Sequence, residues 1–172
     1  MTAVLVVVQG GRAWVGADSR STGLSGSFRD DAAKVIQAHG WVWAVSGTAV
    51  VAAWLRAHLR PPREGEPDED YLLDVSGEAQ LWLKARKAAC GDDGEEHVHM
   101  VAARAGRAWV ATGMGTEPIG DLYAMGDATA PPAAFLCTDG GLAVPDRIRL
   151  AIEAVARVSA YVGGPVNVVE AT

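Results

Sequence analysis

The sequence has few cysteines and no long apolar run, and each shortage excludes a class of protein. Among its 172 residues the cysteines are Cys90 and Cys137, far apart in the chain, so we expect no disulfide framework and a reducing, cytoplasmic compartment. The opening apolar run from Val4 to Val8 is too short for a membrane span or a signal peptide. We therefore expect no membrane partner, and a mature chain that begins within a residue of Met1.

Positive charge is also scarce. The chain has 15 lysine and arginine residues against 21 aspartate and glutamate residues, a formal net charge of −6. An acidic protein repels phosphate groups, so we expect neither nucleic acid nor an anionic membrane as its main partner. The sequence contains no internal repeat and no low-complexity tract, and 49% of its residues are hydrophobic. We expect one domain, residues 1–172, with a substantial core.

The chain does contain short apolar segments separated by turn signals, together with longer amphipathic segments. They predict strands over 3–8, 12–18, 34–38, 41–46, 97–103, 107–112, 122–125 and 166–169, and helices over 48–59, 71–90 and 145–162. The acidic segment 63–70 and the glycine-rich segment 112–120 are predicted to be a loop and turns. The first strand is apolar at every position, which suits a strand covered on both faces. The predicted fold class is α+β, a four-layer αββα sandwich of two antiparallel sheets between helical layers.

Thr2 is the first candidate functional residue. The glycines at 10–11 predict a two-residue turn, so cross-strand partners have numbers that sum to 21. Thr2 then lies opposite Ser19 and one step from Asp18. A threonine in second place by itself indicates no more than the removal of Met1. A free N-terminal threonine, however, combines a hydroxyl nucleophile with an amine base.

A lysine and a carboxylate complete this chemistry. The amine must be neutral to act as a base, and a nearby lysine ammonium lowers the pKa of the amine by charge repulsion. Lys34 is the only lysine before residue 84, and Asp18 is a carboxylate that can hold it charged. Taken singly, Lys34 is typical of a surface residue and Asp18 of a turn or a helix cap. Their joint spacing with Thr2 is the informative feature.

These residues resemble a known family. Thr2, Asp18 in GADSRSTG, Lys34 in AAKVI and Ser46–Gly47 in WAVSGTA are similar to the threonine-nucleophile set of proteasome β-type subunits and their bacterial relative HslV. Both are N-terminal nucleophile (Ntn) hydrolases. The spacing of 16 residues from Thr2 to Asp18, and again from Asp18 to Lys34, fits without a gap. AMGD at 124–127 and AYVGGPVNVVE at 160–170 resemble later parts of the family pattern.

The resemblance implies a threonine endopeptidase without a cofactor. Thr2 would be the nucleophile and, through its amine, the base; Lys34 would tune that amine, and Asp18 would orient Lys34. The backbone N–H of Gly47, or of Ser46 if the alignment slips by one, would form the oxyanion hole. Four residues match the family's pocket for the substrate residue before the cleaved bond: Ala32, Ile36, Ser46 and Val50. Because they are small and uncharged, the pocket is predicted to accept neutral apolar side chains.

Three positions depart from the family pattern. Asp127 stands where the family commonly has a serine, and Ser159 and Val162 stand where proteasome subunits have aspartate and serine. The surroundings of Thr2 are therefore altered. Asp127 either pairs with the Thr2 amine or with Lys34 as part of the catalytic set, or it caps the following helix. The sequence leaves both alternatives open.

One further motif has the spacing of a metal pair. His97 and His99 lie on one face of a predicted strand, but no third ligand is evident, so we expect an exposed strand face and no metal.

The resemblance also implies partners: a peptide or unfolded-protein substrate, an ATP-dependent unfoldase, and copies of the same chain. Stacked rings of six or seven subunits are the implied assembly, with an open spiral as the alternative. Trp54 and Trp82, on predicted outer helices, offer apolar surface for such interfaces. Two other functions stay open: a catalytically silent structural subunit, which a retained Met1 would favour, and a non-proteolytic Ntn amidohydrolase.

Overall fold

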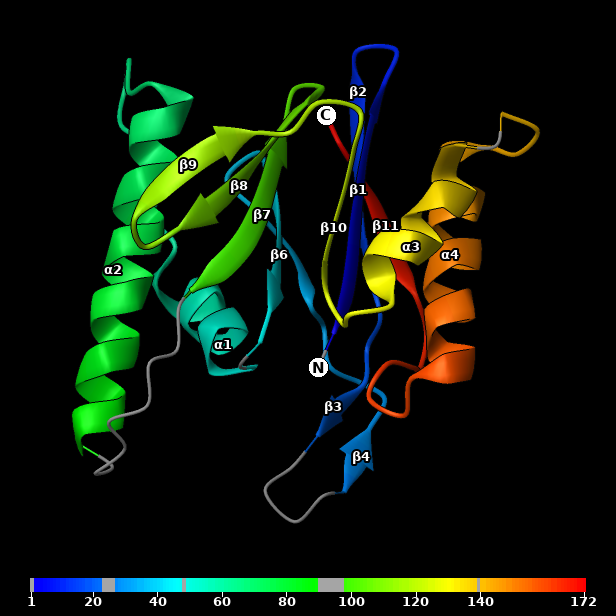
Figure 1. The fold of residues 1–172 in the computed structure, drawn as a ribbon. Coiled ribbons are helices and arrows are strands. Elements are labelled where there is room, and N and C mark those ends of the chain that lie inside the picture. Colours follow the sequence, from blue (N-terminus) through cyan, green and yellow to red (C-terminus); the bar gives the residue numbers. More distant parts are fainter. Residues whose placement is uncertain (1, 23–26, 48, 90–97, 139) are drawn as a thin grey trace.

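The computed structural model of the chain describes residues 2–22, 27–47, 49–89, 98–138 and 140–172. Within them, two antiparallel sheets stack face to face between helical layers (Figure 1). Helices α1 (Ala49–His58) and α2 (Asp68–Ala89) cover one sheet, and α3 (Ala130–Ala134) and α4 (Val144–Val158) cover the other. The predicted four-layer αββα sandwich is confirmed.

The first sheet has the strand order β10-β1-β2-β11, and the second has the order β5-β6-β7-β8-β9. The first comprises β1 (Ala3–Gln9), β2 (Arg12–Ala17), β10 (Leu122–Gly126) and β11 (Asn167–Ala171). The second comprises β5 (Val35–Ala38), β6 (Trp41–Ser46), β7 (His99–Arg104), β8 (Arg107–Thr112) and β9 (Gly115–Pro118). Two short strands, β3 (Ser21–Thr22) and β4 (Phe28–Arg29), pair with each other, and a 3₁₀ helix, η1 (Phe135–Thr138), follows α3.

The β1–β2 hairpin has the register that its glycines predict. Val4 pairs with Ala17 and Gln9 pairs with Arg12, so partner numbers sum to 21 as expected. The turn glycines at 10–11 have φ values of 60° and 72°, a region that glycine enters without steric cost. The start of β1 and the end of β2 therefore lie at the same end of the sheet.

Strand β1 is apolar at every position because both of its faces are covered. Val4 and Val6 pack between the two sheets, against residues of the second sheet. Ala3, Leu5 and Val7 point the other way and pack against the layer formed by α3, η1 and α4. The same alternation places Thr2 on the side of β1 that faces the second sheet.

Tryptophans fill the core between the second sheet and its helices. Trp41, Trp43 and Trp109 are buried there and contact one another or Tyr71 with ring centroids 5.4–6.1 Å apart. Trp54 is only 5% exposed and belongs to this core, and Trp82 packs against it half-buried. The expectation that Trp54 supplies an interface between subunits is therefore wrong, because its ring is already buried within a single chain.

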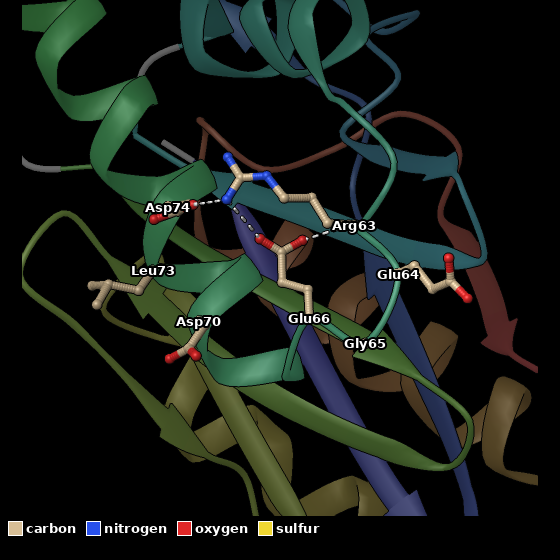
Figure 2. A pocket seen from close by; sticks show the side chains of 7 residues that line it. All are labelled: Arg63, Glu64, Gly65, Glu66, Asp70, Leu73 and Asp74. Atoms are coloured by element: carbon tan, nitrogen blue, oxygen red, sulfur yellow. Dashed lines mark hydrogen bonds and ion pairs between the residues drawn. The ribbon is translucent and has the colours of Figure 1, made fainter.

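The acidic segment before α2 is more ordered than the predicted loop. Glu66 accepts two hydrogen bonds of 2.8 Å from Arg60 and one of 2.7 Å from the Arg63 N–H. These bonds, led by that of Arg60, lower the pKa of Glu66 to about 2. Figure 2 shows Arg63, Glu66 and Asp74 facing one another above the first turn of α2. The helix begins at Asp68 because acidic residues stabilise a helix N-terminus.

Other predicted boundaries also move. Strand β9 lies in a segment that was expected to form turns; it pairs along β8 and carries few apolar residues, so its neighbour rather than its own pattern defines it. Helix α4 ends at Val158 rather than at 162, and α2 continues through Gly77. In the described part of the chain, no helix has the length and apolarity needed to cross a membrane.

Helix α4 packs so closely on β2 that Gly16 admits no side chain. A Cβ at Gly16 would overlap Ile148 Cγ2. We expect Gly16→Ala to lower the free energy of unfolding by about 1–3 kcal/mol, through overpacking, in urea denaturation. In an Ile148→Ala background the same change should cost less, because the clashing methyl is gone. Gly77→Ala is the control: it meets no atom within 4 Å and should leave stability unchanged or slightly raised.

Candidate active site

Thr2 is held through its backbone carbonyl by the end of β10. The Asp127 N–H donates to the Thr2 carbonyl at 2.7 Å. Gly126, with a φ of 104°, comes so close to the same carbonyl that a Cβ would overlap it. Thr2 itself is 4% exposed. The residue predicted to be the nucleophile therefore has a fixed position at the end of the sandwich.

Asp18 joins four segments of the chain close to Thr2. Its Oδ1 accepts the Ala3 N–H at 3.0 Å and the Lys34 ammonium at 2.9 Å. Its Oδ2 accepts the backbone N–H groups of Arg20 and Gly163, each at 3.1 Å. The carboxylate is fully buried and has four donors, so its orientation is fixed. One oxygen thus joins the Lys34 ammonium to the N–H that directly follows Thr2.

Lys34 is buried with its partner. Its side chain is 9% exposed, and Asp18 is the carboxylate that its ammonium contacts. Burial lowers the pKa of Lys34, and the hydrogen bond and charge of Asp18 oppose that shift. The structure thus brings together the lysine and the aspartate that the spacing indicated, and places them beside the first residue of β1.

A cavity of about 450 Å³ opens beside Thr2. The end of β6 forms one wall, where Gly47 has a φ of 87° and turns the chain out of the strand. The start of β7 and the end of β10 form the other walls. Its lining residues are Thr2, Ser46, Gly47, His99, Tyr123, Ala124, Met125 and Gly126. The predicted nucleophile and the two predicted oxyanion-hole residues therefore share one cavity.

The other predicted pocket residues lie outside that lining. Ile36 is buried and packs with the tryptophan core, and Val50 packs against the same core half-buried. Ala32 is half-buried and donates its N–H to the Ser19 carbonyl at 2.9 Å, close to Asp18 in the chain. Of the four, Ser46 alone lines the cavity, so a pocket at Ala32, Ile36 and Val50 stays a prediction.

The carboxylate of Asp127 points to Thr129 and Ser159. Its Oδ1 accepts the N–H and hydroxyl of Thr129 at 2.9 and 2.6 Å, and its Oδ2 accepts the Ser159 hydroxyl at 2.7 Å. These bonds lower the pKa of Asp127, that of Ser159 most. One of these bonds is to the N–H of Thr129, the N-cap of α3, but that helix has no side-chain cap hydrogen bond, so capping by Asp127 stays a prediction. Lys34 is paired with Asp18 instead.

A second hollow, shown in Figure 2, has a volume of about 460 Å³ and is lined by charged groups that are largely paired with one another. Its charged groups stabilise the surface and are less suited to binding a substrate than those of the cavity at Thr2. Among the described residues no cluster of three metal-ligating side chains occurs. The spacing of His97 and His99 cannot be compared with a metal site, since His97 lies outside the described residues, as does Cys90.

Comparison with solved structures shows the same fold. BPH from Thiobacillus denitrificans in complex with epoxomicin has a TM-score of 0.70 at 17% identity, over 98% of this chain and 97% of that one. Eukaryotic HslV from Trypanosoma brucei has a TM-score of 0.66 at 13% identity, over 98% of each chain. Anbu from Yersinia bercovieri has a TM-score of 0.69 at 10% identity, over 98% of this chain and 81% of that one.

No protein-family model matches the chain, and no curated protein is similar to it in sequence. The resemblance to proteasome-like Ntn hydrolases is confirmed at the level of the fold, over nearly the whole chain.

Proposed function

We propose that the chain is a threonine endopeptidase of the proteasome and HslV type, with Thr2 made N-terminal by removal of Met1. One observation carries the proposal: a single buried oxygen of Asp18 accepts both the Lys34 ammonium and the N–H that follows Thr2. A surface lysine or a simple turn aspartate would not need this buried arrangement, whose desolvation is costly. The shared fold and the cavity at Thr2 support the same function.

The reaction is an acyl transfer through Thr2. The Thr2 hydroxyl attacks the carbonyl carbon of the scissile peptide bond, and its proton passes to the amine of the same residue. The backbone N–H of Gly47 or Ser46 stabilises the oxyanion that forms. The C–N bond then breaks, and the ammonium returns the proton to the leaving amine. Water hydrolyses the Thr2 ester with the same amine as base, which restores the hydroxyl and releases the acid.

Lys34 and Asp18 set the protonation state of the base. A buried ammonium near the N-terminal amine disfavours a second positive charge, so the amine is neutral at a lower pH than usual. Asp18 keeps Lys34 protonated, because its charge opposes the effect of burial. The small side chains at Ala32, Ile36 and Val50 would accept an apolar residue on the acyl side of the cleaved bond.

We further propose that copies of the chain assemble into stacked rings of six or seven subunits in the cytoplasm, with peptide or unfolded-protein substrates delivered by an ATP-dependent unfoldase. Large apolar side chains are exposed over both outer layers, where an assembly would bury them. Over the α2 side they are Leu73, Leu81 and Met114, and over the α3–α4 side they are Phe135, Leu136, Leu150 and Val158. Met114 is 83% exposed, and Phe135 and Val158 are each 73% exposed.

Light scattering coupled to size-exclusion chromatography tests this proposal, with each fraction assayed on an unstructured peptide and on a small amide. We expect peptide cleavage to coincide with a species many times the 17.9 kDa mass of one chain. A monomer that cleaves the peptide would refute the assembly. An oligomer that retains Met1 and cleaves nothing would be a structural subunit, and cleavage of the small amide alone would indicate an amidohydrolase.

A further inference from the structure

His99 and Tyr123 form a hydrogen-bonded pair between the two sheets, next to Thr2. The distance from His99 Nε2 to the Tyr123 hydroxyl is 3.0 Å, and the two rings meet edge to face. Val101 and Met125, two residues further along the same strands, pack in the core between the sheets. Because side chains alternate along a strand, His99 and Tyr123 point into the same inter-sheet space. His99 is thus half-buried there rather than on the exposed strand face expected from the sequence.

The order of the strands places this pair on one side of the nucleophile. Strand β6 ends at Ser46 and leads into Gly47, with β5 on one side and β7 on the other. Ala32 and Ile36, predicted for the acyl side, belong to the β5 side. His99 on β7 pairs directly with Ser46. We place the carbonyl of the cleaved peptide bond at Gly47 and the substrate residue before that bond toward β5. The substrate residue after the cleaved bond then lies toward β7.

The pair can donate and accept at once. If the tyrosine hydroxyl donates to Nε2, the Nδ1–H remains as a donor and the phenol oxygen as an acceptor. In the other tautomer, Nδ1 is the acceptor and the phenol O–H the donor. Burial lowers the pKa of His99 and raises that of Tyr123, so both are neutral at pH 7. Each state offers one donor and one acceptor, which complements a carboxamide or a hydroxyl.

We propose that His99 and Tyr123 bind the side chain of the residue that follows the cleaved bond, and that they select an uncharged hydrogen-bonding side chain: asparagine, glutamine, serine or threonine. The proposal rests on the peptidase function proposed above. The cavity of about 450 Å³ has room for one such residue. None of the described residues that line it carries a formal charge, so a charged side chain would lose hydration without gaining an ion pair.

Peptides that differ only in the residue after the cleaved bond test the proposal. We expect wild type to cleave the glutamine peptide about tenfold faster in kcat/KM than the alanine or glutamate peptide. Tyr123→Phe and His99→Leu should each bring the ratio of kcat/KM for the glutamine and alanine peptides close to one. A peptide epoxyketone, which occupies only the acyl side, should still label Thr2 in both variants.

Tyr71→Phe is the matched control. It removes a hydroxyl bond of 2.7 Å to the Arg60 carbonyl. Tyr71 lies on the far side of the second sheet, between that sheet and its helices, so the variant should keep the glutamine preference. An equal loss of kcat/KM on all peptides, or an unchanged glutamine preference in both cavity variants, would overturn the assignment of His99 and Tyr123. Labelling of Thr2 by the epoxyketone would still support the peptidase function in that case. Wild type that neither reacts with the epoxyketone nor cleaves any peptide would contradict the proposed function itself.

Discussion

Thr2→Ala will abolish peptide hydrolysis while the fold and the assembly persist. The variant loses the hydroxyl that attacks the substrate, and we expect kcat to fall by on the order of 10³-fold or more. Stability should change little, because the bond that ties Thr2 to Asp127 runs through the Thr2 carbonyl, which alanine keeps. Peptide turnover and thermal unfolding of the same preparation, after removal of Met1 is verified by mass, measure the two effects.

Thr138→Ala provides the control for that experiment. Thr138 is exposed and bonds only locally, to the Phe135 carbonyl, so its loss should leave turnover at the wild-type level. Thr2→Ser keeps both the hydroxyl and the amine and should retain measurable activity. Substantial hydrolysis by purified Thr2→Ala protein would assign the nucleophile to another residue.

The second large effect concerns Lys34. In the proposed mechanism the rate rises with pH as the Thr2 amine loses its proton, and the Lys34 ammonium would lower the pKa of that amine. Without the ammonium, the amine pKa moves up toward its ordinary value of about 8. In Lys34→Met, we therefore expect the ascending limb of the kcat profile at higher pH, and a loss of up to about tenfold at pH 7.

Lys34→Met also leaves a buried carboxylate without its cation. We expect this to cost up to about 3 kcal/mol of stability, since the backbone donors to Asp18 remain. Lys34→Met combined with Asp18→Asn removes both charges and should keep the pH limb shifted, but we expect no recovery of stability, because the Asn NH₂ faces backbone N–H donors at either oxygen position. Lys84→Ala on the exposed face of α2 is the control with an unchanged profile. A wild-type pH profile in Lys34→Met would exclude the electrostatic role.

Local signals in the sequence predict the first half of the site. Two glycines set the β1–β2 register, which carries Thr2 and Asp18 to one end of the sheet. Lys34 is the only lysine before residue 84, so the choice of lysine follows from residue type alone. These inferences succeed because each depends on one hairpin or on residue type, not on how distant segments pack.

The second half of the site depends on contacts between distant segments. Gly163 donates to Asp18 across 145 positions, and Ser159 reaches Asp127 across 32. His99 and Tyr123 belong to different sheets, so the cavity that they line exists only once the sheets are stacked. The expectation of an exposed face for His99 rested on the lack of a third metal ligand, and the pattern of one strand says nothing of the sheet opposite.

The same limitation applies to Trp54, which was expected at an interface between subunits. Its helix pattern contains a polar face, but the ring of Trp54 stacks on His58 and packs inward with the core around Leu55. Propensity and pattern place a residue on a helix. Packing of the helix against its sheet decides which of its large side chains remain for other partners.

The most direct test of the central claim is the mass of the chain after reaction with a peptide α,β-epoxyketone. Addition of a hydroxyl to the ketone and opening of the epoxide by an amine require both groups, and only a free N-terminal threonine supplies them on one residue. We predict a chain without Met1 that carries one full probe mass, mapped to Thr2 by fragmentation. A chain that retains Met1, or a probe attached elsewhere, would contradict the proposed mechanism.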